Sequence, residues 1–185
     1  NMSLKELTKE QHNNAERQKF ASILLSGKIN EISYLRFLFN QRACYGAIEN
    51  HSHFILPRLE LKRYNNINKD IKELKSILKL NTDIEIQKST IEYVNYVKNN
   101  IKTYDQYIAH VYVRYLGDLR GGQIIARKIP GKGLYYNFQN PNDLAKSIYE
   151  LINDDMAKEA KIVFRFASKL FIELYDEMKK NNEII

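Results

Sequence analysis

A histidine and a glutamate one helical turn apart are the first residues in this sequence that could do chemistry. His12 and Glu16 lie four residues apart, in a segment whose apolar residues recur at helical spacing. Residues at i and i+4 lie on the same side of a helix. A carboxylate there can accept a hydrogen bond from the imidazole nitrogen that does not bind a metal, and so orient a metal-ligating histidine. The pairing with Glu16 favours His12 as an axial metal ligand. The alternative is an exposed contact between the two side chains, which would stabilise the helix by only about 0.2–0.5 kcal/mol.

A glycine-rich stretch is the second unusual feature. Three of the seven glycines, Gly117, Gly121 and Gly122, fall between segments with helical spacing. Because each glycine costs a helix roughly 1 kcal/mol relative to alanine, a helix that continues through them needs a compensating reason. A kink is one reason, and a flat group against bare backbone is another; Asp118 would face the same space. The alternative is that Gly117 ends the helix and that the other two glycines form a turn.

Two phosphate-binding motifs are excluded at this stretch. A Walker loop needs Lys and Ser or Thr after its last glycine, whereas Gln123 and Ile124 follow Gly122. The dinucleotide fingerprint needs a preceding strand, and the residues before Gly117 recur at helical intervals instead. Neither motif accounts for the glycines.

The histidines also fail to match two common metal sites. A di-iron helical bundle needs Glu-x-x-His twice, and no glutamate stands three residues before any of the four histidines, His12, His51, His53 and His110. A zinc site needs three or four convergent ligands, which the spacing does not supply. A lone histidine on a helix is usually structural or exposed, so only His12, with its glutamate, stands out.

What remains is one axial ligand near the start of the chain and a glycine-rich helix that could lie opposite it. A flat cofactor between them would meet an imidazole on one face and bare backbone on the other. Heme suits this arrangement because histidine is a common proximal ligand of heme iron, and the polarity of the distal side decides between O₂ storage and activation. Thirteen tyrosines and eight phenylalanines could supply packing surface.

The apolar spacing predicts about seven helices and almost no strand, so we expect an all-α fold in one domain over residues 1–185, with a core of about 4–178. The first helix begins at a capping box formed by Ser3 and Glu6, runs to about residue 25 and is stopped by Gly27. Further helices are expected at about 30–53, 68–80, 89–116 (continued past the glycines to about 128), 142–152 and 155–178. Residues 134–138 could form a short strand or an aromatic-rich loop.

Composition indicates a globular protein without a membrane span. No stretch approaches 18 uncharged apolar residues, and the polar N-terminus lacks an apolar leader, so we expect a cytoplasmic protein. The only cysteine, Cys44, excludes an internal disulfide and fits a reducing compartment. A net charge of +7 could attract nucleic acid, an acidic protein or an anionic small molecule. Nucleic acid is not expected, because the basic residues are scattered among acidic ones.

Two segments resemble one known family. Residues 115–123 resemble the signature of the heme oxygenases, and residues 8–16 resemble the proximal-histidine segment of that family. The similarity runs from residue 4 to about 178, with both motifs in the right order and separation. It implies a multi-helix bundle that holds heme between the first helix and a glycine-kinked distal helix. The absence of a C-terminal anchor and residues 56–60 look most like the soluble, ferredoxin-dependent, biliverdin-producing branch.

Carried over position by position, the resemblance assigns His12 as the iron ligand and Glu16 as the acid that orients it. Asp118 matches the distal carboxylate, which holds a water that supplies protons and does not touch the iron. Tyr45 and Arg114 match other members of the distal network. The remaining residues implied to border the heme are the distal glycines Gly117, Gly121 and Gly122, the aromatic wall Phe164 and Phe171, and the propionate neighbours Lys5, Lys9, Tyr112 and Lys146.

Four positions depart from the family pattern. Val113 stands where threonine is common, Arg120 where a small residue is usual, and Ala167 where an asparagine often joins the polar network. Glu150 stands where an arginine usually reaches a propionate. This last departure matters most, because propionate anchoring decides which meso carbon faces the oxygen.

The resemblance implies an enzyme that uses O₂ and a reductant to cleave heme, as both substrate and cofactor, to biliverdin, CO and Fe²⁺ for bilin biosynthesis. We expect the IXα isomer, a monomer, and an acidic electron donor such as ferredoxin, which the positive charge would attract. The alternative is a non-catalytic heme-binding or heme-sensing module on the same fold, motivated by Arg120, Glu150 and Ala167.

Overall fold

The computed structural model describes residues 2–184, and within this range all regular secondary structure is helical, as predicted for an all-α fold. It contains no strand among these residues. The α-helices are α1 (Leu4–Leu7), α2 (Lys9–Glu16), α3 (Lys19–Ser26), α4 (Glu31–Glu49), α5 (Tyr64–Leu78), α6 (Lys88–Asn100), α7 (Tyr104–Ile125), α8 (Pro141–Tyr149) and α9 (Ala157–Lys180). Three short 3-10 helices, η1 (Leu59–Leu61), η2 (Leu134–Tyr136) and η3 (Asp154–Met156), lie between them.

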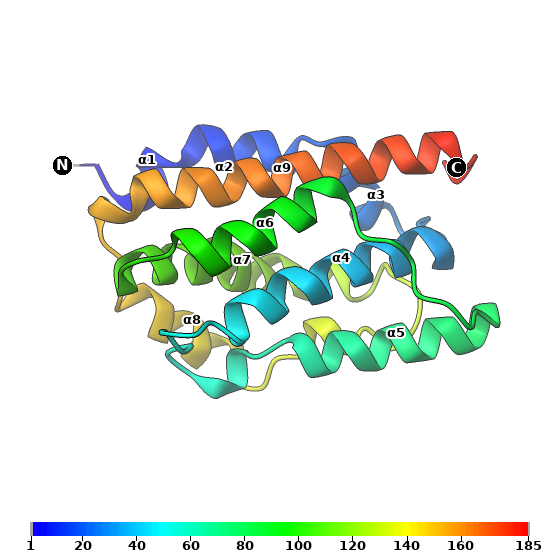
Figure 1. The fold of residues 1–185 in the computed structure, drawn as a ribbon, viewed down its shortest axis with the longest axis horizontal. Helices are drawn as coiled ribbons and strands as arrows, with labels where there is room; N and C mark the ends of the chain where they lie inside the picture. Colours follow the sequence, from blue (N-terminus) through cyan, green and yellow to red (C-terminus); the bar gives the residue numbers. More distant parts are fainter. Residues whose placement is uncertain (1, 185) are drawn as a thin grey trace.

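The helices form a layered bundle around α4 (Figure 1). The helix α9 lies along α2 and α3 at one edge, α5 lies at the opposite edge, and α4, α6 and α7 fill the middle. Every residue of α4 from 33 to 41 is buried, as expected of a helix covered on all sides. None of the helices within residues 2–184 is both long and apolar enough to cross a membrane.

The N-terminal segment is not the single helix that was predicted, because the chain breaks twice. At Thr8 the backbone leaves the helical region (φ −109°, ψ 6°), and its hydroxyl donates to the carbonyl of Leu4 at 2.9 Å. At Gln18 the backbone is extended. Gly27 ends α3 in the left-handed conformation (φ 77°), as expected of a C-terminal glycine. His12 therefore lies on a short helix of its own, α2, which packs against α9.

The predicted helix over residues 89–128 is also two helices. Ile101 is extended, and a new helix begins at a capping box in which the Thr103 side chain accepts from the backbone of Gln106. Helix α7 then continues through the glycines to Ile125, so the alternative in which Gly117 ends the helix is wrong.

Residues 134–136 are a 3-10 helix, neither the strand nor the plain loop considered for this segment. The carboxylate of Asp70 accepts the backbone N–H of Leu134 at 3.0 Å and of Tyr135 at 2.8 Å. The guanidinium of Arg63 donates to the carbonyl of Tyr135 at 2.8 Å. These bonds hold η2 against α5 and α7 and keep the side chains of Tyr135 and Tyr136 buried.

Candidate functional site

The predicted metal ligand lies on α2 and contacts its predicted partner. His12 Nε2 lies 2.9 Å from Oε1 of Glu16, and the side chains are 48% and 66% exposed. The imidazole also meets the ring of Phe164 from α9 edge-on, with centroids 5.5 Å apart. Glu16 engages Nε2, which leaves Nδ1 as the ring nitrogen that the carboxylate does not contact. The side chain is thus accessible and has an aromatic neighbour on one side.

The glycines on α7 divide into two kinds. A Cβ atom added to Gly117 or Gly121 would meet nothing within 4 Å in the described part of the chain. A Cβ atom on Gly122 would lie only 2.5 Å from Cδ1 of Tyr136. The first two therefore leave bare backbone facing open space, whereas Gly122 makes room for a core side chain. That all three glycines border a ligand stays a prediction, and for Gly122 the structure shows a packing role as well.

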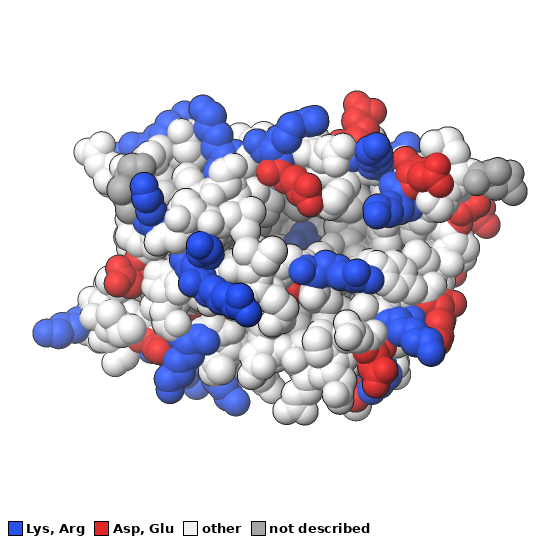
Figure 2. Space-filling view, turned by 180° about the vertical axis from the view of Figure 1, so that it is seen from behind, with Lys and Arg blue, Asp and Glu red and all other residues white. Residues whose placement is uncertain are grey.

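The open face of α7 belongs to a hollowed side of the molecule. Helix α9 packs against both α2 and α7, but α2 and α7 barely touch each other. Figure 2 shows a hollow across this side of the molecule, with a recessed basic side chain at its floor and mostly basic side chains, together with acidic ones, around it. A flat group can therefore approach the backbone at Gly117 and Gly121 without displacing a side chain.

The carboxylate of Asp118 is held by two phenols. Its Oδ2 accepts hydrogen bonds from the hydroxyl of Tyr45 on α4 and from that of Tyr135 on η2, the latter at 3.0 Å. Burial raises the pKa of Asp118 to about 6, while the two hydrogen bonds and the charges of Arg63 and Arg114 partly oppose this rise. Asp118 can thus exchange a proton near neutral pH.

Arg114 lies beneath Asp118 in the core. Its backbone carbonyl accepts from the hydroxyl of Tyr45 at 3.1 Å, and its guanidinium lies over the ring of Tyr93, 4.0 Å from the centroid. Its buried Nε has no hydrogen-bond partner among the described residues. Burial by itself would lower the pKa of Arg114, but neighbouring groups, led by Tyr93, raise it above the usual value. Arg114 therefore keeps a positive charge near the carboxylate.

The fully buried His110 belongs to a structural network. Its Nδ1 lies 2.6 Å from the hydroxyl of Tyr93, and its Nε2 lies 2.8 Å from Oε2 of Glu159. Both nitrogens thus have protein partners, and burial lowers the pKa of the ring. His110 supports the ring on which Arg114 rests.

The two remaining histidines shape a turn. His51 Nδ1 accepts the backbone N–H of His53 at 3.1 Å and of Phe54 at 3.3 Å.

Within residues 2–184 there is no group of three or more His, Cys, Asp or Glu side chains that could hold a metal ion. The accessible imidazole of His12 and the open face of α7 fit a metal that brings its own equatorial ligands, as heme does.

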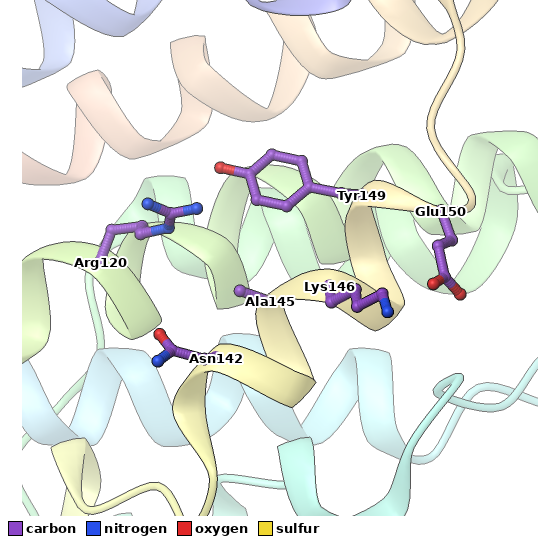
Figure 3. A pocket seen from close by; sticks show the side chains of 6 residues that line it. All are labelled: Arg120, Asn142, Ala145, Lys146, Tyr149 and Glu150. Atoms are coloured by element: carbon purple, nitrogen blue, oxygen red, sulfur yellow. The ribbon is translucent and has the colours of Figure 1, made fainter.

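A pocket between α7 and α8 contains two of the unusual residues of the sequence. It has a volume of about 360 Å³ and is lined by Arg120, Asn142, Ala145, Lys146, Tyr149 and Glu150. The guanidinium of Arg120 lies over the ring of Tyr149, 5.2 Å from the centroid. Figure 3 shows Arg120, Asn142 and Tyr149 converging, while Glu150 extends away from Arg120. The pocket thus has two basic residues, Arg120 and Lys146, and one acidic residue, Glu150, at the position where the family usually has an arginine.

The other predicted site residues are less closely grouped. Lys5 and Lys9 are exposed on α1 and α2, and Tyr112 is half-buried on α7. Phe171 of α9 stacks on Phe20, with centroids 5.8 Å apart, so it supports the wall that begins at Phe164. The structure brings Tyr45 and Tyr135 into contact with Asp118. It does not group Lys5 and Lys9 with the other predicted site residues.

Sequence reasoning missed Tyr135 as a partner of Asp118. Tyr135 was noticed only as part of an aromatic stretch, and no spacing rule connects it to a helix residue 17 positions earlier. Its burial depends on Asp70 and Arg63, which precede it by more than 60 residues.

Comparison with known proteins identifies similar chains. Residues 1–173 match the family model described as "Heme oxygenase". The heme oxygenase of Guillardia theta is 33% identical over 175 residues, covering 86% of this chain and 70% of that protein. That of Porphyra purpurea is 30% identical over 206 residues, covering 96% and 87%. A solved structure of heme oxygenase-1 from the cyanobacterium Synechocystis sp. PCC6803 in complex with heme superposes with a TM-score of 0.79 at 25% identity, covering 96% of this chain and 93% of that chain.

Proposed function

The chain belongs to the heme oxygenase family, and from that premise we propose that it uses O₂ and an external reductant to cleave heme to biliverdin, carbon monoxide and Fe²⁺ for bilin biosynthesis. One observation carries the proposal at the level of the site. The bare backbone at Gly117 and Gly121 adjoins Asp118, whose pKa of about 6 suits proton exchange. The heme in the similar cyanobacterial structure supports the choice of ligand.

The N-terminal side of the site holds the substrate. We assign His12 as the iron ligand, since it is accessible and lies on a helix that α9 braces. Glu16 orients the imidazole, and Phe164 limits its rotation. The bound heme supplies the redox-active iron and the carbon that is oxidised. Gly117 and Gly121 let the ring plane lie against α7, because a side chain at either position would fill that space.

The distal side supplies protons. The best general acid has a pKa near the working pH, and Asp118 meets that condition. Its Oδ2 is engaged by Tyr45 and Tyr135, so Oδ1 is available to hold a water on the open side. Arg114 keeps a positive charge nearby, which limits the rise of the Asp118 pKa. Asp118 therefore holds and releases a proton at the edge of the hollow.

The pocket between α7 and α8 orients the substrate. Heme carries two carboxylates, and Lys146 with Arg120 provides cationic partners for them at this pocket. Lys5, Lys9 and Tyr112 complete the proposed propionate contacts from the other elements. Arg120 adds a positive charge to the pocket that Glu150 also lines, and the IXα isomer is proposed as the product.

The electron donor is proposed to be acidic, such as ferredoxin. The chain carries a net charge of +7, and Figure 2 shows basic side chains around the hollow. Opposite charge on a donor raises the rate of encounter and fixes its orientation.

Reconstitution with heme tests the function against its alternative. The chain is loaded with heme, and reduced ferredoxin and O₂ are added while absorbance is followed. We expect loss of the heme band, a bilin band and Fe²⁺ trapped by a chelator, with the isomer identified by chromatography. Survival of bound heme through repeated additions of reductant would support the heme-sensing alternative, which the unusual Arg120, Glu150 and Ala167 motivate.

A further inference from the structure

Tyr135 makes a direct contact with the carboxylate that the proposed function uses as its proton source. Its hydroxyl donates to Oδ2 of Asp118 at 3.0 Å, and the side chain is fully buried. The amide Nε2 of Gln41 donates to the same hydroxyl at 2.8 Å. Because an amide NH₂ group only donates, the hydroxyl oxygen accepts from Gln41 and its single proton is left for Asp118.

Tyr45 differs, because it has one proton and two acceptors. Its hydroxyl lies within hydrogen-bond distance of both Asp118 Oδ2 and the backbone carbonyl of Arg114. A phenol can donate to only one of them at a time. When Asp118 is ionised, Tyr45 donates to the carboxylate. When Asp118 carries a proton on Oδ2, that proton is donated to the Tyr45 oxygen, and Tyr45 turns its own proton to the carbonyl of Arg114.

We propose that Tyr135 is a positioning residue that holds the Asp118 carboxyl group in place in both protonation states, while the Tyr45 hydroxyl reorients between them. This inference rests on the proposed function, since it concerns the group that supplies protons. The Tyr135 hydroxyl can donate to Oδ2 in both states, but the bond is stronger when the carboxylate is charged, so it also lowers the pKa of Asp118. Asp118 can then gain and lose a proton without changing rotamer.

The anchoring of Tyr135 explains why it can serve as a fixed support. Its backbone is bound at the N–H by Asp70 and at the carbonyl by Arg63, and its ring stacks on Tyr136 with centroids 4.1 Å apart. The hydroxyl therefore cannot follow a moving carboxylate. The titratable and charged groups around Asp118 are Tyr34 and Tyr45 of α4, Arg63 before α5, Arg114 of α7, and Tyr135 and Tyr136 of η2.

The pKa of Asp118 in the heme-free protein tests the proposal. Carboxyl ¹³C chemical shifts are followed against pH in the full chain, and the Asp118 signal is assigned by its absence in Asp118→Asn. We expect Tyr135→Phe to raise the pKa of Asp118 by about one unit, because a donor to the charged form is lost. Tyr136→Phe is the matched control: it keeps the ring that fills the space at Gly122, and its hydroxyl has no bond to Asp118 in the described structure. It should give a pKa closer to that of the unmodified protein.

The pH profile of the loaded enzyme provides the second readout. In Tyr135→Phe the limb of the rate profile that reports Asp118 should move to higher pH by a similar amount. An unchanged Asp118 pKa in folded Tyr135→Phe would overturn the proposal, as would an equal shift in Tyr136→Phe.

If Tyr135→Phe does not fold, Gln41→Met removes the donor that directs the Tyr135 proton, and it should shift the pKa of Asp118 in the same direction. No shift in that variant would also overturn it. Because the NMR measurement needs no heme, it tests the role of Tyr135 even if the protein does not cleave heme.

Discussion

Tyr136 occupies the space that a side chain at Gly122 would need, with its Cδ1 2.5 Å from the position of a Cβ atom. One helical position away, Gly121 faces open space. Adjacent glycines on α7 therefore differ: Gly122 permits the packing of η2 against the helix, and Gly121 leaves the helix surface bare.

Alanine substitutions should distinguish these two glycines. Gly121→Ala should keep or raise the free energy of unfolding of the heme-free protein, by up to about 1 kcal/mol, because alanine favours a helix. It should weaken heme binding in an absorbance titration, since the new methyl group enters the ligand space. Gly122→Ala should lower the free energy of unfolding by about 1–3 kcal/mol, because Tyr136 must move. Equal losses of stability in urea would show that both glycines serve packing.

His12→Ala should abolish the axial ligation of heme and leave the fold intact. The imidazole is about half exposed and contacts only Glu16 and Phe164 among the interactions described, so the free energy of unfolding should change by less than about 0.5 kcal/mol. The absorbance spectrum of the heme complex should change to that of a heme without this ligand. His53→Ala, at an exposed histidine of the turn, is the control. A spectrum of His12→Ala identical to that of the unmodified complex would remove His12 from the site.

Asp118 should make the stability of the heme-free protein depend on pH. Its pKa rises from 3.8 to about 6 on folding, so its folded state binds a proton more tightly than its unfolded state. The stabilising contribution of this group is therefore complete below about pH 4 and is lost as pH rises through about 6. As pH rises from 4 to 7.5, the free energy of unfolding of Asp118→Asn, measured in urea, should increase relative to that of the unmodified protein by on the order of 2 kcal/mol. If the free energies of unfolding of the two proteins differed by the same amount at every pH, the raised pKa of Asp118 would be contradicted.

The pocket between α7 and α8 should influence which bilin isomer forms. Arg120→Ala removes a cation from the pocket that Lys146 also lines, while Glu150 stays, so heme should bind less tightly and the product should contain more than one isomer. Glu150→Arg should tighten binding and favour a single isomer. Both effects are measured by heme titration and by chromatography of the products. The same isomer ratio in both variants and the unmodified enzyme would show that other contacts orient the substrate.

The contact between His12 and Glu16 was predicted correctly because it depends on short spacing along one helix. His12 and Glu16 lie four residues apart, so any helix through them brings them together. The all-α class also follows from local periodicity. Helix ends were predicted less well, because the break at Thr8 depends on a side-chain bond to the backbone, which competes with regular helix geometry.

The sequence by itself determined the helical class, the His12–Glu16 pair and the cluster of glycines beside Asp118. Only the tertiary structure decided which glycines are bare and which phenols hold the carboxylate. Tyr45 and Tyr135 reach Asp118 from elements 73 and 17 residues away. Such contacts depend on how separate helices pack, and packing is set by the whole buried core rather than by the local spacing of residues.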